Sequence, residues 1–160
     1  MKERIWKTAY QVYESADELP EQDRALLQFA KQSLQHSYSP YSNFQVGAAV
    51  LLQNGKMVGG ANQENASYPL CLCAERVALA AAASQFPGEA ALALAVTVHS
   101  PGHLIEKPAA PCGACRQVIC ETECKHQHDI RILLQGETGE ILIFPSAKDL
   151  LPFSFDGSYF

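Results

Sequence analysis

Three cysteines from two separate stretches of the chain could together hold a metal ion. Cys112 and Cys115 form a C-x-x-C motif, and Cys73 forms a C-x-E motif with Glu75. Three thiolates leave the fourth position of a tetrahedral zinc ion open, whereas a structural zinc site closes that position with a fourth protein ligand. We therefore predict one catalytic Zn²⁺ per chain, held by Cys73, Cys112 and Cys115.

Glu75 lies two residues after a predicted ligand, where its carboxylate could accept a proton from water and return it to a substrate. The motifs C-x-E and P-C-x-x-C, the second starting at Pro111, match the signature of zinc deaminases. In those enzymes three cysteines can serve as ligands, and the glutamate is a general acid and base rather than a ligand. We predict that Glu75 is catalytic; the alternative is an acidic residue that only favours a helix N-terminus.

Two arginines are adjacent to these motifs, Arg76 after Glu75 and Arg116 after Cys115. A zinc ion with three thiolates carries a net negative charge, which weakens its power to acidify water. We expect one or both arginines to offset that charge by donating hydrogen bonds to the sulfurs. The alternative for each arginine is an ordinary ion pair at the surface.

Longer stretches around these motifs resemble the small, homotetrameric cytidine deaminases. They run in order through residues 39–49, 60–69, 73–76 and 111–118, and the resemblance extends over residues 38–155. It implies hydrolytic deamination of cytidine and deoxycytidine, a role in pyrimidine salvage, a nucleoside as substrate, and a homotetramer.

The resemblance also implies which residues contact the nucleoside. Asn62 and Glu64 would bind the ribose hydroxyls, and backbone groups near Ala66 and Ala74 would recognise the pyrimidine edge. The ring of Phe44 would pack against the base. Outside this context, a loop Asn/Glu pair and a core phenylalanine would be the simpler interpretation.

A further aromatic residue would reach the site of a neighbouring subunit. In the family it belongs to a Leu-Leu-Pro-x-x-Phe segment, which this chain matches from Leu150 to Phe155. Phe153 is a second candidate, because two aromatic residues lie where the pattern needs one.

The elements that must position these residues alternate between strands and helices. Pro20 opens a helix with an apolar stripe (Leu26, Leu27, Ala30 and Leu34) that ends before Pro40. Further helices are expected over residues 73–83 and from about residue 111, and strands over residues 44–53, 56–61, 91–99, 130–135 and 140–144. Asn54-Gly55 predicts a hairpin turn, and the apolar run 91–99 predicts a strand buried on both faces. The pattern favours one α/β domain over residues 1–160, a three-layer α/β/α arrangement around a central mixed sheet.

Two parts of the sequence are left without a function. Residues 1–20 are an N-terminal extension that we expect to be strand-like over residues 5–13. Cys120, Cys124, His126 and His128 resemble a second metal cluster, but their spacing fits common zinc sites poorly.

Composition excludes several other classes. The net charge of −5 and the absence of a basic cluster argue against nucleic-acid binding. No apolar run approaches the roughly 20 residues of a membrane helix, and no signal peptide is evident, so we expect a cytoplasmic location. Three alternatives stay open: a deaminase for a blasticidin-type cytosine antibiotic, a structural zinc module in which Cys71 supplies a fourth thiolate, and a redox protein that uses the C-x-x-C dithiol.

Overall fold

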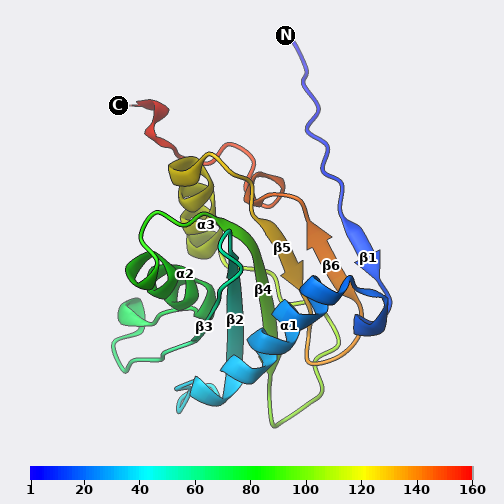
Figure 1. Ribbon diagram of the computed structural model, residues 1–160, viewed down its shortest axis with the longest axis vertical. Coiled ribbons are helices and arrows are strands. Elements are labelled where there is room, and N and C mark those ends of the chain that lie inside the picture. Colours follow the sequence, from blue (N-terminus) through cyan, green and yellow to red (C-terminus); the bar gives the residue numbers. More distant parts are fainter. Residues whose placement is uncertain (160) are drawn as a thin grey trace.

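The computed structural model describes residues 1–159, and its strands form one mixed six-stranded sheet (Figure 1). The strands are β1 (Gln11–Tyr13), β2 (Gln45–Leu52), β3 (Met57–Ala61), β4 (Ala91–His99), β5 (Arg131–Leu134) and β6 (Ile141–Phe144). They lie in the order β1-β6-β5-β4-β2-β3. Only β4 and β5 pair in parallel, and the other neighbours are antiparallel.

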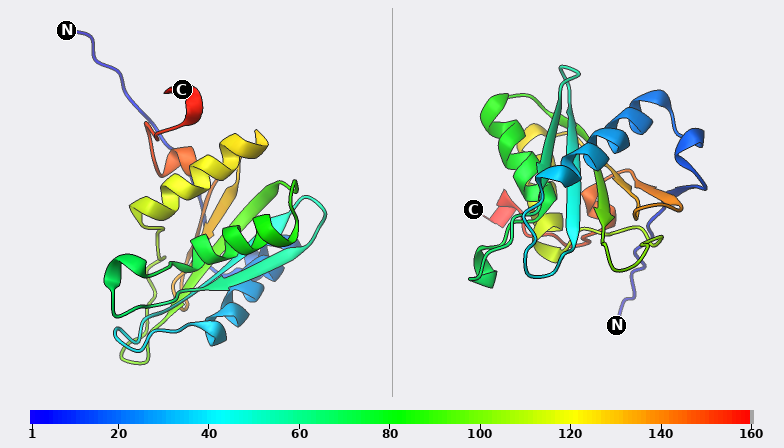
Figure 2. Two further views of the ribbon diagram at one scale, coloured as in Figure 1. Left: turned by 90° about the vertical axis from the view of Figure 1, so that its left-hand side faces the viewer. Right: turned by 90° about the horizontal axis from the view of Figure 1, so that it is seen from below.

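Helices cover both faces of this sheet, which confirms the predicted three-layer α/β/α fold (Figure 2). Helix α1 (Glu21–Ser33) packs on one face, and α2 (Ala74–Gln85) and α3 (Gly113–His126) pack on the other. Single-turn 3-10 helices occupy Ala16–Glu18, Leu34–His36, Tyr68–Leu70, Ala147–Asp149 and Gly157–Tyr159. No helix in residues 1–159 is long and apolar enough to cross a lipid bilayer.

Strand alternation divides the core into two clusters. In β2, Ala48, Val50 and Leu52 point toward α2 and α3, while Ala49 and Leu51 point toward α1. Strand β4 is apolar on both faces and contributes to both clusters, as its continuous apolar sequence predicts.

The predicted hairpin at Asn54-Gly55 is present. Gly55 has a φ of +79°, a conformation that glycine adopts without strain, and β2 and β3 pair on either side of the turn. At the other end of β3, Gly60 lets α2 approach closely, because a Cβ at that position would collide with the backbone of Ala74 and Ala78. This approach places the first turn of α2 beside the residues that follow β3.

The expected strand over residues 5–13 is only partly correct, since the strand is limited to residues 11–13. β1 pairs with β6, which offers only four residues before Pro145. Because proline has no backbone N–H to donate, it ends the strand ladder there. Residues 1–10 continue beyond the sheet without regular secondary structure (Figure 1).

Candidate active site

The three predicted ligands meet at the N-termini of α2 and α3. Cys73 is the N-cap of α2 and Cys112 is the N-cap of α3, each with an extended backbone, and Cys115 lies in the first turn of α3. The Cys112 sulfur lies 3.8 Å from that of Cys73 and 3.5 Å from that of Cys115. Among residues 1–159, these cysteines form the single group of three or more potential ligands whose atoms lie within 4.8 Å of one another.

This geometry fits a zinc ion. With a Zn–S distance of about 2.3 Å, two sulfurs of a tetrahedral site lie roughly 3.8 Å apart. The Cys71 thiol belongs to a different contact, since its sulfur accepts a hydrogen bond from the Asn65 backbone nitrogen at 3.2 Å. The donor set is therefore three sulfurs rather than four, which argues against the closed structural module.

The surroundings of Cys73 favour its thiolate. Hydrogen bonds from Cys115, then from Cys112 and Arg76, lower the pKa of Cys73 to about 5 despite partial burial. The positive N-terminal end of α2 acts in the same direction. The pKa of Cys115 is raised, chiefly because its thiol donates a hydrogen bond to Cys73 and because it is buried. Three clustered cysteine sulfurs, one of them readily ionised, are suited to binding a cation.

Arg76 lies where a charge-compensating group is needed. Its guanidinium contacts the Cys73 sulfur, and Nη2 donates to the Cys71 carbonyl oxygen at 2.8 Å. The buried Nε has no hydrogen-bond partner among the residues that the structure describes. A donor held in this position is suited to a negatively charged metal–thiolate group.

Arg116 is directed elsewhere, and the expected contact between this arginine and a sulfur is not seen in the described residues. Its Nε donates to the Pro111 carbonyl oxygen at 2.8 Å, and Nη1 donates to the Leu150 carbonyl oxygen at 2.7 Å. Arg116 therefore ties the start of α3 to the C-terminal segment.

Glu75 lies in the first turn of α2 and is only 4% exposed. Burial raises the pKa of Glu75 above its usual range, the neighbouring Cys73 thiolate adds to the increase, and a hydrogen bond from the Cys115 thiol opposes it. A carboxyl group with a raised pKa beside a metal centre is suited to accepting and returning a proton.

A pocket of about 350 Å³ opens onto this group. Cys73, Cys112 and Glu75 line it, together with the predicted nucleoside contacts Phe44, Asn62 and Glu64. The volume falls within the range of small-molecule sites. The remaining walls are Val46, Gln63, Cys71, Leu72, Val96, Val98, Ala109 and Ala110.

Asn62 and Glu64 also build the loop that carries Phe44. Asn62 Oδ1 accepts from the Val46 nitrogen at 2.8 Å, and its Nδ2 donates to the Phe44 carbonyl oxygen at 2.9 Å. The Glu64 carboxylate accepts from the Tyr41 nitrogen at 2.9 Å and from the Ser42 hydroxyl. One Nδ2–H of Asn62 and the remaining acceptor capacity of Glu64 can still face a ligand.

The other predicted contact residues are placed differently. Ala74 is fully buried at the start of α2, directly between Cys73 and Glu75, and Ala66 lies in an exposed bend. Phe155 is 58% exposed and does not line the pocket of its own chain. Its carbonyl oxygen accepts from Gln117 Nε2 at 2.7 Å.

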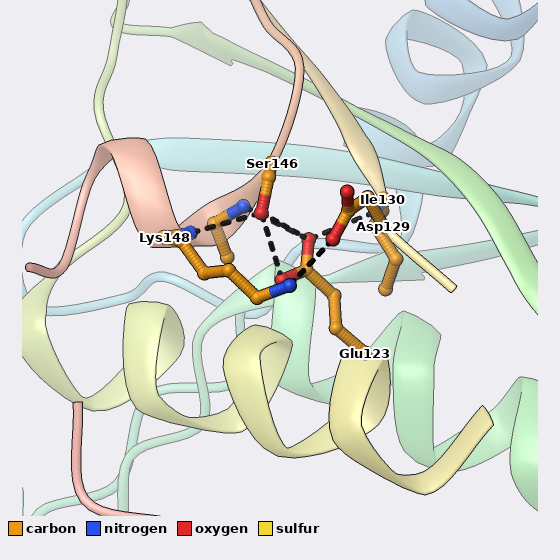
Figure 3. Close-up of polar contacts among 6 residues, drawn as sticks. Glu123, Asp129, Ile130, Ser146 and Lys148 are labelled. Atoms are coloured by element: carbon orange, nitrogen blue, oxygen red, sulfur yellow. Dashed lines mark hydrogen bonds and ion pairs between the residues drawn. The ribbon is translucent and has the colours of Figure 1, made fainter. Parts of the chain in front are cut away.

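The motifs did not identify two features, one in the pocket and one near the C-terminal end of α3. The pocket walls Val96 and Val98 project from the end of β4, and the alternation of that strand could have indicated them. The second is Glu123, a buried carboxylate on α3 that accepts hydrogen bonds from the Ile130 and Ala147 nitrogens and the Ser146 hydroxyl (Figure 3). Cys120, Cys124, His126 and His128 do not gather into a second cluster in the described part of the chain.

Comparison with known proteins shows to which family this chain belongs. Residues 20–127 match the family model described as "Cytidine and deoxycytidylate deaminase zinc-binding region". A cytidine deaminase of Halalkalibacterium halodurans is 42% identical over 131 residues, which cover 81% of this chain and 91% of that protein. The chain belongs to the cytidine deaminase family.

Solved structures of cytidine deaminases share the fold. The crystal structure of cytidine deaminase from Burkholderia pseudomallei matches with a TM-score of 0.71 and 44% identity, covering 82% of this chain and 97% of that one. The enzyme from Mycobacterium tuberculosis matches with a TM-score of 0.64 and 35% identity, covering 82% and 95%. The zinc cofactor predicted from the sequence is therefore supported both by the family and by the cysteine geometry.

Proposed function

We propose that this chain hydrolyses the exocyclic amine of cytidine and deoxycytidine, giving the uracil nucleosides and ammonia. One observation carries the proposal: Glu75 and two of the three clustered cysteines line the same pocket as Asn62 and Glu64. Groups suited to the chemistry and groups suited to a sugar thus face one cavity.

In this proposal Cys73, Cys112 and Cys115 hold Zn²⁺, which when bound lowers the pKa of a coordinated water toward neutrality. Glu75 accepts the proton from that water and delivers it to N3 of the pyrimidine, which makes C4 more electrophilic. Once the water oxygen has bonded to C4, Glu75 takes the second proton from that oxygen and passes it to the amine, so that the C4–N bond breaks and ammonia leaves. The raised pKa of Glu75 supports this role, because a carboxyl group that is easily protonated can return the proton it accepts.

The sugar is recognised by Glu64 and by the free Nδ2–H of Asn62. A hydrogen bond from the Ser42 hydroxyl lowers the pKa of Glu64, so the carboxylate is ionised at neutral pH and can accept from ribose hydroxyls. A negative charge facing the sugar repels a 5′-phosphate. We therefore propose that nucleosides are preferred over nucleotides.

The base is held between the Phe44 ring and the first turn of α2. Phe44 lines the same pocket as Glu64 and Glu75. From the family resemblance, backbone groups near Ala66 and Ala74 recognise the pyrimidine edge. We propose that Phe155 completes the site of a neighbouring subunit in a homotetramer. The Phe155 side chain is exposed and does not line the pocket of its own chain, which supports that role.

The biological role that follows is pyrimidine salvage, since the products are uracil nucleosides. A cytoplasmic location stays a prediction from the sequence.

Ammonia release from four substrates, followed with and without a chelator, tests the proposal. We expect turnover of cytidine and deoxycytidine, much slower turnover of cytosine and cytidine monophosphate, and loss of all turnover after zinc removal. Zinc restored to the chelated protein should return the activity. Chelator-resistant turnover, or a preference for the monophosphate, would contradict the proposal.

A further inference from the structure

The N-terminal extension contacts the C-terminal part of the chain at several points. Residues 6–13, named here the N-terminal strap, follow residues 141–153 in the opposite direction (Figure 1). In β1, Gln11 pairs with Ile143. The Tyr10 ring stacks on Phe144 with a centroid distance of 5.1 Å.

Two further contacts continue this course beyond the sheet. Thr8 Oγ1 donates to Asp149 Oδ1 at 2.7 Å, and the Trp6 ring lies 5.8 Å from that of Phe153. The contacting residues 6, 8 and 10 alternate along the chain, so an extended backbone turns one side toward the C-terminal segment. Ile5, just outside the strap, is 77% exposed.

The segment that the strap contacts is also tied to the start of α3. Arg116 donates to the Leu150 carbonyl oxygen, and Gln117 donates to that of Phe155. These bonds hold residues 150–155 close to the helix that carries Cys112 and Cys115.

Between those two ties, the backbone adopts a strained conformation. Phe153 has a φ of +62°, in the left-handed region that an aromatic residue rarely enters. Such a conformation persists only where surrounding contacts hold it. The Trp6 ring is the aromatic partner that the structure gives Phe153.

We propose that the N-terminal strap is a positioning element for the active site. By holding Phe153, it fixes the course of residues 150–155 and therefore the direction in which Phe155 is presented. This inference rests on the proposed role of Phe155 in the nucleoside site. The family model begins at residue 20, so the strap is a feature of this chain outside the matched region.

Substitution of Trp6 in the full-length zinc enzyme tests this inference. Trp6 is 55% exposed, so Trp6→Ala should fold. We expect KM for cytidine to rise about threefold to tenfold, with kcat within twofold of the wild type and one zinc per chain. Chymotrypsin, which cleaves after aromatic residues, should cut after Phe153 and Phe155 at least threefold faster. Trp6→Phe should largely restore both values, and Ile5→Ala should match the wild type.

Two results would overturn the strap as a positioning element. One is Trp6→Ala with the same cleavage rate and KM as Ile5→Ala. The other is faster cleavage of Trp6→Ala with an unchanged KM, provided that Phe155→Ala does raise KM.

Phe155→Ala separates this inference from the function on which it rests. If KM is unchanged in Phe155→Ala, the proposed role of Phe155 is wrong, and the strap loses its function in the site with it. Deaminase activity and the zinc content are measured in every variant, so failure of the proposed reaction is seen independently.

Discussion

Arg76 occupies the third position of α2 and reaches back to the sulfur of Cys73, the N-cap of the same helix. A side chain three residues after an N-cap points toward that cap, as in a capping box. The same offset separates Cys112 from Cys115 in α3, and it brings their sulfurs to 3.5 Å. The same local geometry at the N-termini of the two helices thus places two sulfurs together in α3. In α2 it places one sulfur beside the Arg76 guanidinium.

Arg76→Gln should weaken zinc binding. The arginine contributes to the low pKa of Cys73, so its removal raises that pKa and lets protons compete with the metal. We expect zinc affinity to fall about 10-fold to 100-fold, and zinc release on acidification to begin at a higher pH. Competition with a chelator at several pH values measures both effects.

Two matched variants control for the loss of charge. Arg116→Gln removes a cation that directly follows a predicted ligand, Cys115, but that bonds to backbone carbonyls. Arg24→Gln removes an exposed arginine on α1. Equal zinc loss in all three variants would show that the contact between Arg76 and Cys73 is not responsible.

Glu75→Gln should bind zinc normally but lose turnover. The amide keeps the size of the side chain and cannot transfer the proton, so kcat should fall at least about 100-fold, the lower end of general acid–base contributions. On the same preparation, metal analysis checks the zinc content and steady-state kinetics check the loss of turnover. Near-native kcat would remove Glu75 from the mechanism.

Ser42→Ala should make nucleoside binding more sensitive to acid. The Ser42 hydroxyl lowers the pKa of Glu64, so the carboxylate stays ionised to a lower pH than an ordinary glutamate. Without the hydroxyl, protonation begins at a higher pH as the solution is acidified, and KM should begin to rise at that higher pH. The measurement is the ratio of KM at acidic pH to KM at pH 8, with zinc content verified.

Glu64→Gln is the control for that experiment, because the amide does not titrate in this range. Its KM should be raised at both pH values, with a ratio closer to one than that of the wild type. An unchanged ratio in Ser42→Ala would contradict the role of this hydrogen bond.

Glu123→Ala should destabilise the fold. The buried carboxylate satisfies the Ile130 and Ala147 backbone nitrogens and the Ser146 hydroxyl (Figure 3). Leaving these donors without an acceptor should lower the free energy of unfolding by about 3 kcal/mol or more. Urea denaturation of the zinc-loaded protein measures this change. Glu121→Ala, an exposed glutamate on the same helix, should change it by less than about 0.5 kcal/mol.

The sequence predicted the elements and ligands that depend on local pattern. The apolar stripe of α1, the hairpin at Gly55 and the run of β4 follow from periodicity and turn chemistry. The cysteines were found because their motifs place them at helix starts.

Features that depend on distant partners were not predictable in the same way. Glu123 is recognisable only once Ser146 and Ala147 are known to lie beside it. The different directions of Arg76 and Arg116 depend on their offsets of three and four residues from the N-caps, rather than on adjacency to Glu75 or Cys115. Residues 5–10 have a strand-like composition, but β6 is too short to pair with them.

X-ray absorption at the zinc edge tests the central claim most directly, because it counts the atoms that bind the metal in the purified protein. We predict one zinc per chain with three sulfurs at about 2.3 Å and one lighter atom, and one sulfur fewer in Cys73→Ser. Four sulfurs around the metal, or a Cys73→Ser spectrum identical to that of the wild type, would contradict a three-cysteine site with an open position.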